Sequence, residues 1–444
     1  MKTLWVCYFV LPDFCEEFGL KRKYYGGWIS GILNQLKMNY KELEIGLCFP
    51  IMDKSKMKDG ELNSCKYYSF SNSSLYSIES ISEIEEMTKR FETIINDFKP
   101  DIIHIWGSEL PHAFAAVKAC ENLSMINKVI LDIQALYFVY ANHFYADIPE
   151  QYKALNSNNI ASLDEQKNLY IEFGKLEIQL IKMIRYAFGR TDWDKACVTQ
   201  INSNINYYQC NRILRSLFYE HIGGWNISNI KRHSIFISQA YYPVKGLHYL
   251  LQAMPSVLSE FPNAHIYVSG SKVSVENGKD ISPYAVYLND LIEKFGLADK
   301  ITFLGPLDEE LMVKQYLRSH VSVSASTIEN SSNSVSEAML LGVPIVSSYV
   351  GGICNLLRDK VDGLLYQHDA PYMLAHYICE IFGDDNLAVK FSKNASESMR
   401  EIVDRKTNTE QYLKVYKNIG KEYKNGFNET DRSAFKQTAL EAKC

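Results

Sequence analysis

The feature that most constrains the fold of this chain is a repeated alternation of short apolar runs with amphipathic stretches. In the first half, apolar runs lie at residues 3–11, 43–49, 102–106 and 128–133. Stretches with helical periodicity separate them, at residues 27–36, 81–98 and 110–122. Alternation of strands and helices favours a parallel sheet with right-handed crossovers. The first half is therefore predicted to form an α/β domain, in which residues 151–188 read as one longer helix.

A second alternation begins after a polar stretch that contains Gly223 and Gly224. Its predicted strands are residues 234–238, 265–269, 301–303, 320–324 and 344–347, and its predicted helices are 246–260, 284–295, 309–317 and 335–341. We therefore expect two Rossmann-like α/β domains, residues 1–224 and 225–405, with parallel sheets that face each other across a cleft. Residues 406–444 are predicted to form a helix that packs back on the first domain and then a polar tail.

Composition indicates a soluble globular protein and argues against nucleic acid as its main partner. Of 444 residues, 47% are hydrophobic and 22% are charged, a mix that supports buried cores. The 47 basic and 52 acidic residues give a net charge of -5, so no global positive field attracts a polyanion. No apolar run is long enough to cross a bilayer.

The cysteines indicate a reducing compartment. Ten are scattered along the chain without a CxxC pair, and no histidine cluster has metal-ligand spacing. The apolar run that opens the chain ends at Pro12 and Asp13, which fits a buried strand better than an export signal. We therefore expect a cytoplasmic protein, with any membrane contact peripheral and at the inner face of the membrane.

Ligands of open parallel sheets bind at the carboxyl ends of the strands, so the turns from strand to helix are where a site is expected. After residue 326, an apolar strand runs through small polar residues into a helix. Ser332 or Asn333 is predicted to cap this helix by accepting its free N–H groups. The remaining amides, near Ser334 and Val335, together with the helix dipole suit a phosphate.

Two carboxylates flank this helix start. Glu329 lies in the loop and Glu337 lies within the helix, so both are expected to reach one ligand that crosses the amino end. Carboxylates accept hydrogen bonds well from vicinal diols, which a hexose and a ribose both offer. A solvated loop followed by a capping acid is the alternative interpretation of the same spacing.

Three other turns carry features that suit a diphosphate. Lys245 lies where a turn enters a helix, and an ammonium there neutralises the charge that grows on a departing diphosphate. Gly26-Gly27, after the first strand, would let backbone amides approach a ligand closely. Gly351-Gly352 follow a later strand and would line the same cleft. Each feature taken singly also fits an ordinary turn or a solvated lysine.

The order of these features resembles the retaining glycosyltransferases of family 4, which have the GT-B fold. Those enzymes carry a loop Glu, seven residues, a second Glu, Ala-Met-x-x-Gly-x-Pro, a strand, and Gly-Gly. The matching residues here are Glu329, Glu337, Ala338, Met339, Gly342, Pro344, Gly351, Gly352 and the later Asp362-Gly363. Lys245-Gly246 matches the family's Lys-Gly turn, and the resemblance covers roughly residues 3–420.

The resemblance implies a metal-independent enzyme that transfers a sugar from a nucleotide-sugar donor to an acceptor hydroxyl, with retention at the anomeric carbon. It assigns Glu329 to the donor sugar and Glu337 to the ribose. Lys245 and the amides near Ser334 and Val335 would hold the diphosphate, and the two glycines after the first strand would border the site. Surface polysaccharide or glycolipid synthesis is a common setting, so a glycan or lipid-linked acceptor is expected. No cofactor is expected, because the nucleotide sugar is a substrate.

The chain also departs from the family pattern. Ala240 stands where the family usually has an arginine five residues before the lysine, and we expect Arg190 to supply that charge across the cleft. Gln134 replaces a sugar-positioning histidine and can still hydrogen-bond to a sugar hydroxyl. Asn330 stands at the family's Phe-Gly, and Asn355 stands where a Glu often follows Gly-Gly. These changes leave the fold intact and the donor identity open.

Two rival functions remain open. Ala240 and Gln134 also fit a catalytically silent GT-B protein that binds a sugar nucleotide or partners an active enzyme. Asp192 and Asp194 imitate the Asp-x-Asp metal motif of the other large glycosyltransferase class, although they follow a helical stretch rather than a strand. Our main prediction therefore contains no metal. The donor base, the sugar, the acceptor, the linkage and the oligomeric state are not set by the sequence.

Two further groups of residues have an ordinary and a functional interpretation. His104 and Trp106 end a strand predicted to face the cleft, where His104 fits an acceptor site or a hydrogen-bonded strand end equally well. The basic residues 21–23 and their aromatic neighbours fit a contact with anionic lipid or, more commonly, a solvated loop.

Overall fold

The first half of the chain builds a mostly parallel sheet in the computed structural model, which describes residues 1–21, 26–72, 77–155, 160–270 and 282–424. Its strands are β1 (Lys2–Val6), β2 (Glu44–Ile51), β3 (Gly60–Leu62), β4 (Cys65–Ser71), β5 (Ile102–Trp106), β6 (Val129–Asp132), β7 (Tyr186–Gly189) and β8 (Asn206–Gln209). The strand order is β3-β4-β2-β1-β5-β6-β7-β8, and only the pairing of β3 with β4 is antiparallel among these strands. Central strands such as β5 are buried along their whole length because helices cover both faces of the sheet.

The helices of this domain are α1 (Gly27–Asn39), α2 (Ile84–Phe98), α3 (Pro111–Asn122), α4 (Tyr137–His143), α5 (Glu150–Lys153), α6 (Leu163–Met183) and α7 (Asp192–Ile201). Two apolar cores form, one on each face of the sheet. The start of α6 is fixed by a capping box, in which Ser162 and Glu165 each bind the backbone amide of the other.

The second half builds a fully parallel sheet with the order β11-β10-β9-β12-β13-β14. Its strands are β9 (Lys231–Ile237), β10 (His265–Ser269), β11 (Ile301–Gly305), β12 (Ser319–Ser324), β13 (Ile345–Ser348) and β14 (Leu364–Tyr366). Its helices are α9 (Leu247–Glu260), α10 (Pro283–Lys294), α11 (Glu309–Arg318), α12 (Asn333–Leu341), α13 (Pro371–Gly383) and α14 (Asp385–Ile402). Helix α12 ends where Gly342 adopts a left-handed φ of 78°.

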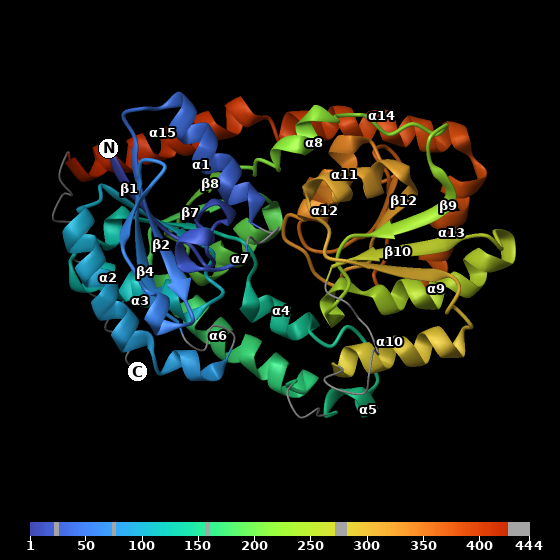
Figure 1. Cartoon of the computed structure of the whole chain (residues 1–444), viewed down its shortest axis with the longest axis horizontal. Helices are drawn as coiled ribbons and strands as arrows, with labels where there is room; N and C mark the ends of the chain where they lie inside the picture. Colours follow the sequence, from blue (N-terminus) through green and yellow to red (C-terminus); the bar gives the residue numbers. More distant parts are fainter. Residues whose placement is uncertain (22–25, 73–76, 156–159, 271–281, 425–444) are drawn as a thin grey trace.

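The chain passes between the two domains more than once (Figure 1). The stretch around α5 packs against the second domain, where Tyr152 joins the core, and α6 then returns to the first sheet. The chain crosses again just before α8 (Ser216–Glu220), because Ile213 packs in the first domain and Phe218 in the second. It returns through α15 (Arg405–Lys424), whose residues Tyr412 and Tyr416 pack among the core residues of the first domain. The helices α14 and α15 therefore run along one side of both domains.

The predicted α/β architecture with two parallel sheets is confirmed, and the differences are local. Strand β1 ends at Val6, because the apolar residues after it turn away from the sheet into short 3-10 turns that begin at Pro12. The long helix predicted for residues 151–188 is instead α6 followed directly by the strand β7. Strands β3, β4, β8 and β14 were not predicted either. In the described part of the chain, no helix combines the length and apolar character needed to cross a bilayer.

Candidate active site between the two sheets

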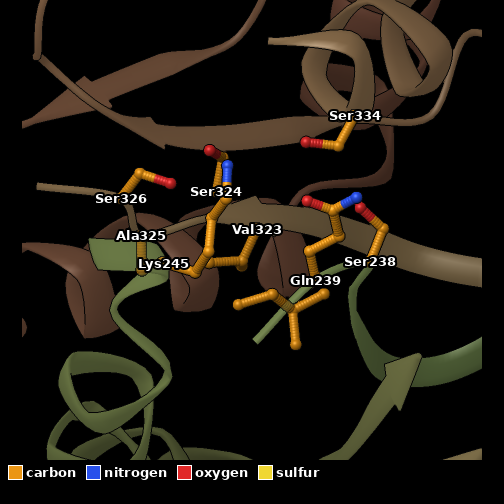
Figure 2. A pocket seen from close by; sticks show the side chains of 9 residues that line it. Ser238, Gln239, Lys245, Val323, Ser324, Ala325, Ser326 and Ser334 are labelled. Atoms are coloured by element: carbon orange, nitrogen blue, oxygen red, sulfur yellow. The ribbon is translucent and has the colours of Figure 1, made fainter. Parts of the chain in front are cut away.

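A polar pocket lies at the carboxyl edge of the second sheet. Ser238 and Gln239 follow β9, Ser324 ends β12, and Lys245 closes the turn before α9. Ser334, in the first turn of α12, completes the wall, as Figure 2 shows. Hydroxyl, amide and ammonium donors around one pocket suit an anion that has several acceptor oxygens.

The amino end of α12 borders this pocket and carries no side-chain cap. Ser332, the N-cap residue, shares a hydrogen bond with the Ser334 hydroxyl at 2.9 Å instead of binding the helix amides. Asn333 accepts a hydrogen bond from Arg212 at 2.9 Å. Neither residue predicted to cap the helix does so. The side chain of Val335 is fully buried, so its backbone amide is the only group that it offers to a ligand. An uncapped amino end, with free N–H groups and a positive dipole end, favours an anion.

Lys245 and Glu329 form an ion pair beside the pocket. Ser326 donates its hydroxyl to the same carboxylate oxygen at 2.8 Å. Burial lowers the pKa of Lys245, but Glu329 and neighbouring tyrosines outweigh this effect, so the pKa is raised overall and the ammonium stays charged. Glu329, which was predicted to contact the donor sugar, is therefore held next to Lys245, which was predicted to bind the diphosphate.

Gly351 and Gly352 hold the loop that carries Glu329. A Cβ on Gly351 would lie 2.0 Å from the carbonyl oxygen of Glu329, and one on Gly352 would lie 2.3 Å from that of Asn330. The amide of Gly352 donates to the Glu329 carbonyl at 3.0 Å. Larger residues would push this loop away. The glycine pair therefore lets the backbone of the loop that carries Glu329 lie close to it.

The second carboxylate, Glu337, is bound by Arg215. Nε and Nη2 of Arg215 donate to Oε1 of Glu337 at 3.1 and 2.8 Å. Burial raises the pKa of Glu337, and Arg215 opposes that shift. Gly27 borders this pair from the first domain, because a Cβ there would lie 2.4 Å from the Arg215 side chain. Gly26 begins α1 with a φ of 87°, where a Cβ would strike the ring of Phe9.

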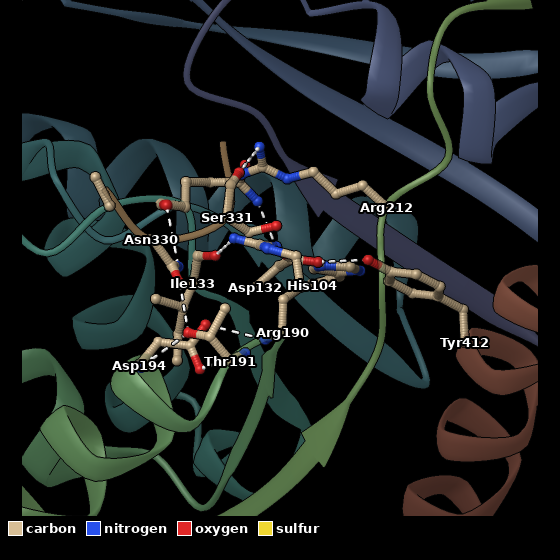
Figure 3. A network of polar contacts seen from close by, with 12 residues as sticks. His104, Asp132, Ile133, Arg190, Thr191, Asp194, Arg212, Asn330, Ser331 and Tyr412 are labelled. Carbon is tan, nitrogen blue, oxygen red and sulfur yellow. Dashed lines mark hydrogen bonds and ion pairs between the residues drawn. The ribbon is translucent and has the colours of Figure 1, made fainter. Parts of the chain in front are cut away.

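Arg190 does not occupy the place predicted for it. Its side chain is buried in the first domain, where Nη1 donates to Oδ1 of Asp132 at 2.8 Å and Nη2 donates to the carbonyl of Ile133. Tyr412 of α15 donates to the other oxygen of Asp132 at 2.7 Å (Figure 3). The prediction that Arg190 supplies charge across the cleft is therefore wrong, because Asp132 already neutralises its guanidinium.

Arg212 and Arg215, which reach the site, were not found from the sequence. Both come from the segment between β8 and α8, which carries no recognisable motif. Arg212 donates through Nη2 to Oε1 of Gln134 and through Nη1 to Oδ1 of Asn333. Gln134 also donates to Asp132 at 2.5 Å, so both ends of its amide are engaged by protein groups. The sequence held one hint that an arginine must come from elsewhere in the chain: Ala240 stands where the family usually has one.

Asp192 and Asp194 have separate structural tasks. Asp194 accepts from the backbone amides of Arg190 at 3.0 Å and Thr191 at 3.3 Å, which closes the capping box of α7. Asp192 accepts from Nδ2 of Asn355, in the second domain, at 3.0 Å. Across the described ranges, no three or more His, Cys, Asp or Glu side chains gather as a metal site requires. The resemblance to a metal motif is explained by a helix start.

His104 and Trp106 lie inside the first core and not at the cleft. The His104 side chain has no exposed surface, its ring centroid lies 4.3 Å from that of Trp106, and its Nδ1 is hydrogen-bonded to the Tyr416 hydroxyl. Burial holds the pKa of His104 well below its usual value, so the imidazole is neutral. The acceptor-site interpretation of His104 is therefore wrong. Residues 22–25, which hold most of the basic and aromatic segment, lie outside the described residues.

The comparison with protein families matches the second domain. Residues 226–398 match the model described as Glycosyl transferases group 1. An uncharacterized glycosyltransferase of Methanocaldococcus jannaschii is 28% identical over 183 residues, which is 41% of this chain and 44% of that protein. The chain thus spans less than half the length of this relative.

Solved structures match nearly the whole chain. Sucrose-phosphate synthase from Thermosynechococcus elongatus superposes with a TM-score of 0.71 at 14% identity, covering 94% of this chain and 99% of that one. HepE of Anabaena, solved in complex with UDP and glucose, superposes with a TM-score of 0.64 at 15% identity, covering 94% and 100%. The chain therefore has the GT-B fold, and its second domain, which carries Lys245, Glu329 and Glu337, matches the group 1 glycosyl transferases.

Proposed function

We propose that the chain is a retaining glycosyltransferase that moves a sugar from a nucleotide-sugar donor to a hydroxyl of a glycan or lipid-linked acceptor. The observation that carries the proposal is that Lys245 and the uncapped start of α12 border one pocket, while Glu329 is paired with Lys245 and Glu337 lies on the same helix. The match of the second domain to glycosyl transferases and the UDP bound in HepE support the same conclusion.

The donor diphosphate would occupy the pocket at the start of α12. Lys245 and the hydroxyl of Ser334 line that pocket, and the helix amides and dipole add to the attraction for an anion. The Lys245 ammonium is paired with Glu329 in the structure. A bound diphosphate would take over this ammonium and free the carboxylate for the hydroxyls of the donor sugar.

Glu337 is suited to hold the ribose. Arg215 occupies only Oε1 of this carboxylate, and no donor from the described residues is bound to Oε2. A ribose diol can therefore donate to Oε2 without displacing the ion pair. The guanidinium favours the charged form of the carboxylate against the effect of burial and fixes its direction, which is the preorganisation that a binding group requires.

The proposed reaction breaks the bond between the anomeric carbon and the diphosphate oxygen and forms a bond from that carbon to the acceptor oxygen on the same face. The acceptor proton passes to the departing phosphate oxygen, so no protein base is needed. Lys245 and the helix amides would stabilise the negative charge that develops on the leaving group. The protein contributes position and charge, which is the largest source of rate enhancement in such sites.

The proposal is tested by nucleotide binding followed by turnover. Titration calorimetry with UDP, GDP and ADP identifies the base, and release of nucleotide from the matching sugar nucleotides measures hydrolysis or transfer. Lys245→Ala is expected to lower kcat by about 100-fold or more, whereas Glu337→Ala is expected to raise the Kd for the nucleotide. Lys314→Ala, an exposed lysine on α11, is the control that leaves both unchanged.

Two outcomes would contradict the proposal. Full activity in both the Lys245 and the Glu337 variants would show that these residues do not form the active site. Nucleotide binding without release of sugar from any donor would instead support a catalytically silent GT-B protein, for which the occupied amide of Gln134 is the favouring observation.

A further inference from the structure

Arg212 is a half-buried cation without a carboxylate partner among the described residues. Its guanidinium donates to Oε1 of Gln134, to Oδ1 of Asn333 at 2.9 Å, and to the carbonyl of Ser331 at 3.5 Å, all of which are neutral acceptors. None of the ion pairs found among the described residues includes Arg212. Its Nε is buried and has no hydrogen-bond partner there. The other two cations near α12 each have a carboxylate, so Arg212 leaves the site with excess positive charge.

The surroundings of Arg212 add to this excess. Burial lowers its pKa to about 10, and the nearby Arg190 lowers it in the same direction. Asp132 is the acidic group that most opposes this shift, but that carboxylate is bound to Arg190 and Tyr412 (Figure 3). Asn333, which Arg212 binds, is the first residue of α12, where the helix dipole is also positive. A cation is normally unfavourable at this end of a helix, so the arrangement gains stability when an anion is present.

The guanidinium of Arg212 is held in a fixed orientation. Its central carbon lies 5.1 Å from the ring centroid of Trp28, which belongs to α1 directly after the glycines that begin this helix. Gln134 and Asn333 fix the two terminal nitrogens from the first and the second domain. A planar donor group held by a ring and by two side-chain amides matches the geometry that phosphate recognition uses.

We infer that Arg212 binds the diphosphate of the donor and is the second cation of that site, opposite Lys245. This inference rests on the proposed function and extends it, because the second cation comes from the segment that joins the domains and not from the second domain itself. The diphosphate would then be held by Lys245 and the start of α12 on one side and by Arg212 on the other. The site would be complete only when both domains are in contact.

The inference is tested by comparing ligands that differ only in their phosphates. Titration calorimetry with Arg212→Gln would use whichever of UDP, GDP and ADP binds the wild type most tightly, together with the corresponding nucleoside. We expect the affinity for the diphosphate to fall by about 10- to 100-fold, the range of a lost hydrogen bond to a charged group, and the affinity for the nucleoside to stay the same. Arg232→Gln, which removes an exposed arginine paired with Asp385, is the matched control.

Arg212→Lys keeps the charge but loses the planar fork, so it should bind the diphosphate more weakly than the wild type and more tightly than Arg212→Gln. It also serves as the test variant if the glutamine variant does not fold. An unchanged affinity for the diphosphate in both variants would overturn the inference, and so would an equal loss for diphosphate and nucleoside, which indicates a structural role. A wild type that binds none of the three diphosphates would contradict the proposed function itself.

Discussion

At the scale of single residues, the pair of Arg215 and Glu337 shows how an arginine opposes the effect of burial on a carboxylate. Both side chains are mostly buried, with 15% and 10% of their surface exposed. Burial raises the pKa of Glu337, and the neighbouring guanidinium limits the shift. Removing one partner of such a pair leaves the other as an uncompensated buried charge, which is more harmful than removing both.

We therefore predict that Arg215→Met lowers the free energy of unfolding by about 3 kcal/mol near pH 8. Without the guanidinium, the folded-state pKa of Glu337 rises further above its unfolded value, so the folded variant binds a proton that the unfolded chain has released. Its stability must then fall as pH rises through this interval. The deficit relative to the wild type should shrink toward pH 4, measured by urea unfolding at several pH values.

The control for this prediction is Arg215→Lys, which keeps a positive charge next to Glu337 and should recover part of the loss. Arg215 also packs over the ring of Phe218, at 4.7 Å from its centroid. A deficit of the same size at pH 4 and pH 8 would show that this packing, and not the charge, is what the variant removes.

The sequence identified some site residues and missed others for a physical reason. Glu329 lies in the loop before α12 and Glu337 lies in α12, so their spacing in the sequence was enough to predict that both are near the start of this helix. Arg212 and Arg215 contact partners 121 and 122 residues away in the sequence. No local pattern reports a contact of that range, and the arginines themselves are ordinary polar residues in a connecting segment. Only the folded chain shows that they belong to the site.

At the scale of elements, α12 is a helix whose start is left without a cap. Ser332 has extended backbone angles that suit an N-cap residue, but its hydroxyl binds Ser334. A side chain that capped this helix would occupy amides that the proposed ligand uses, and a carboxylate cap would also bring a negative charge there. The helix therefore gives up local stability that a cap would supply, in favour of an open anion site.

Ser332→Asp tests this trade between stability and binding. The new carboxylate should cap α12 and raise the free energy of unfolding by about 0.5–1 kcal/mol, while nucleotide diphosphate binding is lost. Ser332→Ala is the matched control and should change neither quantity strongly, because the native hydroxyl does not cap the helix. Thermal unfolding and calorimetry measure the two effects. Tight diphosphate binding by the aspartate variant would place the ligand elsewhere.

Other elements show where periodicity succeeds and fails. Strand β5 is buried throughout and apolar except for His104, as suits a central strand covered on both faces, and it was predicted with its observed bounds. Strand β7 was missed because only Ile184 and Arg185 separate it from α6, so the apolar residues of the strand continue the apolar pattern of the helix. A turn without glycine or proline gives no boundary signal.

Helix α6 carries a buried carboxyl group that should make stability depend on pH. Glu177 is fully buried, accepts from Ser108 at 2.6 Å, and accepts from the amide of Phe138 in the first turn of α4 at 3.1 Å. Burial raises its pKa from 4.5 to about 8. The folded chain thus keeps a proton that the unfolded chain loses, and stability should fall as pH rises through this window.

Glu177→Gln imitates the protonated form and should remove this dependence. The wild type is expected to lose up to a few kcal/mol of unfolding free energy between pH 5 and pH 9 relative to the variant, since each unit of pKa shift corresponds to about 1.4 kcal/mol. Parallel urea unfolding curves for the two proteins across that range would measure it. Two pH profiles of identical shape would show that Glu177 is ionised in the folded protein.

At the scale of the whole molecule, the positions that depart from the family pattern link the two domains. Thr191 donates to Oδ1 of Asn330 at 2.9 Å, and Nδ2 of Asn330 donates to the carbonyl of Gln134 at 3.3 Å. Asn355 accepts from the amide of Asp192 at 3.1 Å and donates to its carboxylate at 3.0 Å. These bonds join the carboxyl edges of the two sheets, which is the surface that the proposed donor would occupy. The sequence placed these residues near the site but gave no sign that they pair across it.

The double variant Thr191→Val and Asn355→Ala should therefore let the domains separate in the absence of ligand, because interfaces between domains are usually mobile unless specific contacts hold them. We expect a larger radius of gyration in small-angle scattering and weaker binding of the nucleotide diphosphate, since Arg212 and α12 would meet less often. The melting temperature should change little, because each lost bond contributes only about 1 kcal/mol. Asn394→Ala, which removes an exposed bond to Val361 within the second domain, is the control. An unchanged radius and an unchanged affinity would mean that other contacts between the domains, such as the bond from the Tyr249 hydroxyl to Asp147, are enough to hold them together.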